Sequence, residues 1–143
     1  MTDTELLDYW AARTGLEPQR RPEAQMAWGD IEIALGMREM DDRFEVISAN
    51  RGHWVVDGVT WSRDPSVAML LARFGQLWRS SNGLRDPFPA GLAAGSLVRR
   101  VPEGHLAQVD GVEGVFRSED DARVFTYVAH RSHDDISVMM ATR

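Results

Sequence analysis

The chain has 143 residues and a formal net charge of −6, with sixteen arginines, no lysine and no cysteine. This length is enough for one domain with its own core, and the acidic balance argues against nucleic acid as a partner. The absence of cysteine excludes disulfides, thiolate metal sites and a cysteine nucleophile. The polar start of the chain lacks the pattern of a signal peptide, and no apolar run approaches a membrane span, so we expect a cytoplasmic protein with no membrane partner.

The first predicted element is a helix that begins near the N-terminus. Thr2 and Glu5 form a capping-box pattern, the apolar residues that follow have helical spacing, and Gly15 suits the position after the helix end. Residues 16–25 contain two prolines and a pair of arginines. We predict an irregular connection for this stretch.

Period-2 alternation then predicts strands between residues 25 and 61. Ile31, Ile33 and Leu35 form the apolar face of one strand, and the alternation over residues 44–49 predicts another. Met40–Arg43 reads as the turn between them. Residues 50–53 interrupt the pattern and are predicted to be a loop.

The tetrapeptide Val-Asp-Gly-Val occurs twice, at residues 56–59 and 109–112. Asp-Gly between apolar residues favours a type I′ hairpin, because that turn needs positive φ at both central positions. A turn at Asp57-Gly58 would set Trp54 opposite Trp61 across the hairpin. The sequence thus predicts two hairpins, each followed by a helix, although their identity is too slight to indicate a duplication.

The helix after the first hairpin is predicted to begin with Asp64 as the cap and Pro65 as its first residue. A broad apolar stripe follows between residues 67 and 78, interrupted at Gly75. Residues 80–96 are rich in glycine and proline and form the longest stretch without a predicted element. A loop of this length inside a compact domain is often functional or mobile.

The last part of the chain is predicted to hold a strand at 97–101, a hairpin over 104–116, and helices capped by Ser118 and Ser132. Together these elements predict an α+β fold in one domain, residues 1–143. We expect an antiparallel sheet of about six to eight strands arranged in hairpins, with three or four helices packed on it.

No stretch of the sequence carries a catalytic, cofactor or metal motif. The nearest to a metal cluster is His130-x-x-His133 with Asp134-Asp135, but Ser132 is expected to break the helix between the two histidines, and no further ligand motif accompanies them. Gly-x-Ser-x-Gly, Gly-x-Gly-x-x-Gly and P-loop patterns are absent. Paired aspartates are typical of turns and helix starts. We therefore expect no enzyme, no cofactor and no metal.

A small acidic domain with five tryptophans and no catalytic motif suits a protein that binds another protein. Exposed candidates are the 50–53 loop, the 80–96 loop and acidic positions such as Asp41 and Asp42, which would attract a cationic partner. Arg51 and Trp54 are residue types enriched among interface hot spots. Gly52 either allows close approach of a partner or only serves the turn.

Three stretches of the chain resemble the immunity proteins that neutralise NAD glycohydrolase toxins of the tuberculosis necrotizing toxin class. The first is Phe44–Arg51. The second is Val67–Gly75 with Trp78-Arg79 and Gly83-Leu84. The third runs from Asp110-Gly111 through Val115-Phe116, Asp121-Ala122, Phe125 and Tyr127-Val128 to Asp134–Ile136. The likeness covers most of the chain from about residue 30 onward.

The resemblance implies a bacterial antitoxin that binds the catalytic domain of a cognate toxin as a monomer, in a 1:1 complex, and occludes the NAD-binding cleft. The position that corresponds to a cleft-blocking loop is around Asn50-Arg51-Gly52-His53. With Trp54, Asp41 and Asp42, these residues are the predicted partner-binding residues.

Two other hypotheses remain open. One is a secretion chaperone or adaptor, which would commonly homodimerise through apolar helix faces. The other is a small enzyme whose site combines His105, His130 or His133 with carboxylates in a deep polar pocket.

Overall fold

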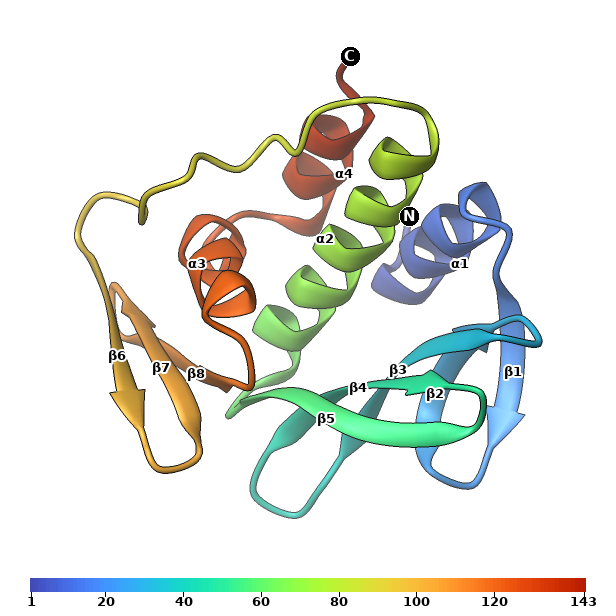
Figure 1. Ribbon diagram of the computed structural model, residues 1–143, viewed down its shortest axis with the longest axis horizontal. Helices are drawn as coiled ribbons and strands as arrows, with labels where there is room; N and C mark the ends of the chain where they lie inside the picture. The colour runs from blue at the N-terminus through green and yellow to red at the C-terminus, as the bar shows by residue number, and fades with distance from the viewer.

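Four helices and eight strands make up the computed structural model, which describes residues 1–143 (Figure 1). The helices are α1 (Asp3–Arg13), α2 (Arg63–Ser81), α3 (Glu119–Val128) and α4 (His133–Ala141). The strands are β1 (Glu17–Arg21), β2 (Ala24–Gly29), β3 (Ile33–Glu39), β4 (Phe44–Asn50), β5 (His53–Thr60), β6 (Ser96–Val101), β7 (Gly104–Val109) and β8 (Val112–Phe116). The predicted α+β class with an antiparallel sheet is confirmed. None of the helices is long and apolar enough to cross a bilayer.

All eight strands form one antiparallel sheet in the order β1-β2-β3-β4-β5-β8-β7-β6. The four helices cover one face of this sheet, and α2 runs diagonally across its middle (Figure 1). Strands β5 and β8 are joined by only three residue pairs, from Gly58 opposite Phe116 to Thr60 opposite Gly114. We call this narrow junction the seam, because it divides the sheet into a five-stranded and a three-stranded part.

The core lies between the sheet and the helices and is centred on α2. Trp28 stacks edge-on against Phe74 of α2 at 5.6 Å, and Trp10 of α1 does the same against Trp78 at 5.6 Å. The apolar stripe predicted for α2 is therefore confirmed. Gly75 does not interrupt the helix; it leaves room for Met140 of α4, whose side chain would overlap a Cβ at this position.

Helix starts with a serine or threonine cap follow the sequence closely. The side-chain oxygens of Thr2, Ser118 and Ser132 accept hydrogen bonds from the backbone N–H three residues later, at 3.0–3.1 Å. The cap predicted at Asp64 is wrong, because α2 begins two residues earlier, with Ser62 in the cap position and Pro65 inside the first turn.

Two predictions for the strands are also wrong. Residues 16–25 are not irregular, because β1 and β2 pair as a hairpin from Glu17 opposite Gly29 to Arg21 opposite Ala24. Asp57-Gly58 is not a turn, since both residues lie inside β5. The turn between β4 and β5 is at Arg51-Gly52 instead, where φ is +52° and +79°.

Candidate functional site

The predicted partner-binding residues 50–54 lie at the end of the β4–β5 hairpin. Asn50 pairs with His53, and Arg51-Gly52 forms the two-residue turn between them. Positive φ at both positions is the requirement of a type I′ turn, so Gly52 serves the turn. No protein atom lies within 4 Å of the position that a Cβ on Gly52 would occupy, so the space in front of the turn is also open to a partner.

A second turn, between β2 and β3, lies directly beside this one. The Arg51 N–H donates to the Glu32 carbonyl at 2.7 Å, and Arg51 Nε lies 3.2 Å from Glu32 Oε2. Trp54 is half-buried opposite Ala49 and helps to line a cavity of about 40 Å³ between the turns, together with Gly52 and Ile31. We call residues 30–33 and 50–54 the two-turn surface.

Ile31 of this surface is placed differently from the prediction. Its alternation with Ile33 and Leu35 predicts a core position, but β3 begins only at Ile33 and Ile31 is 93% exposed. No local signal in the sequence separates the exposed Ile31 from the half-buried Ile33, because both fit the same period.

Asp41 and Asp42 lie at the opposite end of β4 from the two-turn surface. They form the predicted turn between β3 and β4, closed by a hydrogen bond from Met40 N–H to the Arg43 carbonyl at 2.8 Å. Seven strand residues separate the turns, which corresponds to roughly 20 Å. One partner could reach both groups only by lying along β4.

The seam carries a groove on the face of the sheet that the helices leave open. Val59 and Val115 pair across the seam and alternate with the core-facing Phe116, which places them on this open face. The groove holds about 630 Å³, and Trp61 at its border is 53% exposed. Because the hairpin turns at Arg51-Gly52, Trp54 lies opposite Ala49 and not opposite Trp61, which corrects the predicted aromatic pair.

A group of four charged residues closes the seam, and we call it the seam cluster: Asp57, Arg73, Arg117 and Asp121. Asp57 has no partner on β4, because the register shifts there from Val46–Gly58 to Ile47–Val56, which makes Asp57 the extra residue of a β-bulge. Its side chain is buried and lies 3.4 Å from Arg73 on α2 through Oδ2 and 3.4 Å from Arg117 through Oδ1. Asp57 Oδ2 accepts no hydrogen bond, so its contact with Arg73 is a charge contact only.

Arg73 is shared between two carboxylates of the seam cluster. Its Nη1 lies 3.5 Å from Asp121 Oδ2 on α3 as well as 3.4 Å from Asp57 Oδ2. Burial raises the pKa of Asp121 above its ordinary value, and the nearby charges of Asp57 and Asp120 add to this effect, while Arg73 opposes it. Because the sequence predicts a hairpin turn at Asp57-Gly58, it gives no indication of this cluster.

Two histidines line a polar hollow of about 640 Å³ at the starts of α1, α2 and α4, beside Asp3 and Asp64. One ring nitrogen of each histidine contacts a backbone carbonyl: Nε2 of His130 lies 2.8 Å from the Val109 carbonyl, and Nε2 of His133 lies 3.1 Å from the Asp64 carbonyl. Asp3 is paired with Arg63, whose hydrogen bond lowers the pKa of that carboxyl. No group of three or more potential ligands that could hold a metal is present.

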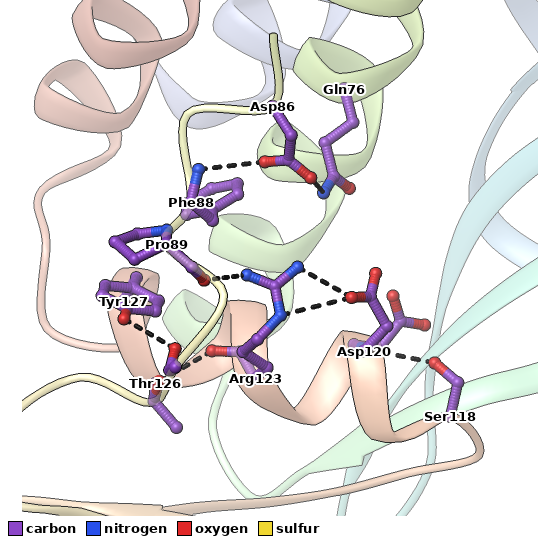
Figure 2. Close-up of polar contacts among 11 residues, drawn as sticks. Gln76, Asp86, Phe88, Pro89, Ser118, Asp120, Arg123, Thr126 and Tyr127 are labelled. Atoms are coloured by element: carbon purple, nitrogen blue, oxygen red, sulfur yellow. Dashed lines mark hydrogen bonds and ion pairs between the residues drawn. The ribbon is translucent and has the colours of Figure 1, made fainter.

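Residues 82–95 connect α2 to β6 and pass over α3 without forming an element of their own (Figures 1 and 2). Asp86 accepts hydrogen bonds from Gln76 and from the Phe88 N–H, and the ring of Phe88 is buried. Figure 2 shows Arg123 of α3 between Asp120 and the Pro89 carbonyl, to which it donates. The segment is thus attached to α2 and α3 at several points.

Comparison with known proteins identifies a similar fold but no family. No family model and no curated protein matches the chain. Among solved structures, the chain is similar to Rv3902c from M. tuberculosis, with a TM-score of 0.73 and 14% sequence identity. The match covers 95% of this chain and 87% of that chain. At this level of identity the likeness shows a shared fold alone.

Proposed function

We propose that this chain is an immunity protein, which binds a cognate NAD glycohydrolase toxin domain and blocks its active site. The observation that carries the proposal is the two-turn surface. It projects the exposed residues Asn50 to His53 from the end of a hairpin, at the position that corresponds to a cleft-blocking loop in the resembling family.

The contacts within the two-turn surface support a role in tight binding. The Arg51 N–H donates to the Glu32 carbonyl at 2.7 Å, which joins the backbones of the two turns and reduces the freedom that they lose on association. The ion pair between the two exposed side chains adds little to this. A hairpin tip of this shape fits a concave site better than a flat one. The open space before Gly52 lets the backbone of the tip approach a cleft wall closely.

The resemblance supports this class of partner, and the fold comparison supports the fold that the proposal requires. The stretch Phe44–Arg51 that carries part of the resemblance is β4 and the first residue of its turn, so it leads directly into the two-turn surface. The similarity to the solved structure of Rv3902c from M. tuberculosis extends over 95% of this chain, so the fold around β4 and the two-turn surface is one that a natural protein also adopts.

Co-expression with a candidate NAD glycohydrolase toxin domain tests the proposal, with cell survival and cellular NAD as the readouts. We expect survival with preserved NAD and a 1:1 complex that co-purifies. Death with NAD depleted, for every toxin domain of this class, would overturn the NAD link. Rescue from a toxin of another class would retain immunity without it, and a homodimer with no toxin binding would favour a chaperone or adaptor.

Two pairs of variants locate the interface once a complex is found. Arg51→Asn removes the guanidinium with a residue that tolerates positive φ, and Trp54→Ala removes the half-buried indole. We expect each of these two variants to weaken the complex by about 2 kcal/mol or more, which is the effect of removing a hot-spot side chain. Arg100→Ala on β6 and Trp61→Ala at the seam are the matched controls. Loss of binding in the controls alone would place the interface elsewhere.

A further inference from the structure

Ile31 stands out as the most exposed of the large apolar side chains within the folded chain, at 93%. It occupies the tip of the turn between β2 and β3, where neither the sheet nor a helix covers it. An apolar residue in this position gains nothing from folding, because its surface remains in water. Its exposure leaves an apolar side chain available for contact with a partner.

The turn that carries Ile31 is held rigidly by Asp30. Asp30 Oδ1 accepts hydrogen bonds from the Glu32 N–H at 2.7 Å and the Ile33 N–H at 2.8 Å, and the Asp30 N–H donates to the Ile33 carbonyl at 2.9 Å. The two bonds to the carboxylate, from Ile33 and Glu32, lower the pKa of Asp30, so the side chain stays ionised and bonded at neutral pH. The tip is consequently fixed before any partner arrives.

The charges beside Ile31 indicate the chemistry of its surroundings in a complex. Glu32 is paired with Arg51 at 3.2 Å, whereas Asp30 lies within ion-pair distance of no cation. Asp30 thus leaves a carboxylate without a direct ion pair next to the exposed Ile31, with Arg21 of β1 lining the same small cavity, in a chain whose net charge is −6. A complementary partner offers an apolar pocket with a basic side chain at its rim.

We propose that Ile31 is the apolar anchor of the complex, inserted into such a pocket of the toxin domain with a basic side chain of the toxin facing Asp30. This inference rests on the proposed function and adds a residue and a partner chemistry to it. Ile31 is suited to this role because its turn is joined to the turn at Arg51 and Gly52 by the contacts between Arg51 and Glu32. The apolar side chain supplies affinity, and Asp30 fixes the tip and selects the basic rim.

Affinity measurements on the purified complex provide the first test. We expect Ile31→Ser to weaken binding by about ten- to a hundredfold, the effect of leaving one apolar side chain unburied. Val138→Ser is the matched control, since Val138 on α4 is also a strongly exposed apolar residue, at 67%. Asp30→Ala should weaken binding. Asp30→Asn should weaken it less, because an amide oxygen still accepts the two backbone hydrogen bonds.

The absence of cysteine from the chain allows a second, independent readout. In Ile31→Cys, the thiol should react with an alkylating reagent at least about ten times more slowly in the complex than in the free chain, because a buried thiol is shielded. The thiol of Val138→Cys should react at the same rate in both.

Three outcomes would overturn the inference, and they are distinguishable from one another. Wild-type affinity in Ile31→Ser, with an equally reactive thiol at position 31, would remove the anchor while leaving toxin binding intact. A wild-type dimer that Ile31→Ser converts to a monomer would assign Ile31 to self-association. The absence of any complex with the wild-type chain would overturn the proposed function and the anchor together.

Discussion

The same four residues, Val-Asp-Gly-Val, adopt two different structures in this molecule. At Val109–Val112 they form the predicted hairpin turn, with φ of +47° at Asp110 and +82° at Gly111. At Val56–Val59 they lie within β5, and Asp57 is buried in a β-bulge at the seam. The difference shows that Asp-Gly forms a hairpin turn only where the strand pairing of the sheet accommodates one.

The register of the sheet decides between the two outcomes. A turn at Asp57-Gly58 would leave β4 without its neighbour, whereas the turn at Arg51-Gly52 pairs β4 with β5 from Phe44–Thr60 to Asn50–His53. It also brings Gly58 beneath the ring of Phe116 across the seam. Gly58 is therefore required for space and Gly111 for its backbone conformation.

Substitution of the two glycines gives the largest expected difference. In Gly58→Ala the new Cβ would overlap the buried ring of Phe116, so we expect the free energy of unfolding to fall by about 3 kcal/mol. Gly111→Ala meets no atom within 4 Å and suffers only from its positive φ, at a cost of about 1 kcal/mol. Urea unfolding measures both. Equal losses would mean that the seam is not packed as described.

Substitution of the two aspartates, Asp57 and Asp110, should also reduce the free energy of unfolding by different amounts, with a smaller difference than for the glycines. Asp57→Asn removes a buried charge from beside Arg73 and Arg117. We expect the free energy of unfolding to fall by about 2 kcal/mol. The loss is limited to this amount because Arg73 is partly exposed and keeps its contact with Asp121. Asp110→Asn should change the free energy of unfolding by less than about 0.5 kcal/mol, because Asn also suits a type I′ turn. If Asp57→Asn left the free energy of unfolding unchanged, the seam cluster would not contribute to stability.

The pH dependence of stability gives a further test of the seam cluster, through its residue Asp121. Its pKa is raised in the folded chain, so the folded state binds a proton more tightly than the unfolded state does. The stability from this group is present below its unfolded pKa near 3.8 and is lost as the pH rises through the folded pKa. Asp121→Asn cannot titrate, so its stability relative to the wild type should increase over this window. A constant difference between the two from pH 3.5 upward would contradict the burial of Asp121.

The sequence predicts elements well where a local signal agrees with the tertiary structure. Thr2, Ser118 and Ser132 cap helices because a side-chain oxygen three residues before a free N–H needs no distant partner. The second hairpin is also predicted from local signals alone. The first hairpin is not, because its register depends on β8, which follows β5 by more than 50 residues.

The candidate site was only partly predictable for the same reason. The interruption of the strand pattern predicts a loop at residues 50–53, and the structure confirms a turn for Arg51-Gly52, whereas Asn50 and His53 are the paired ends of β4 and β5. The sequence does not predict the positions of Ile31 and Asp57. The period-2 pattern extends back to Ile31 although β3 begins two residues later, at Ile33, and a β-bulge leaves no mark on a single strand. Both residues are placed by contacts between distant segments.

Amide hydrogen exchange with and without a bound NAD glycohydrolase toxin domain shows whether the two-turn surface is the interface, because it reports on every turn in one experiment. We expect slower exchange at residues 30–33 and 50–54 in the complex, and unchanged exchange at the Asp110-Gly111 turn. Protection confined to the helices, to β6 or to the Asp110-Gly111 turn, with no change at the two-turn surface, would show that the toxin binds elsewhere.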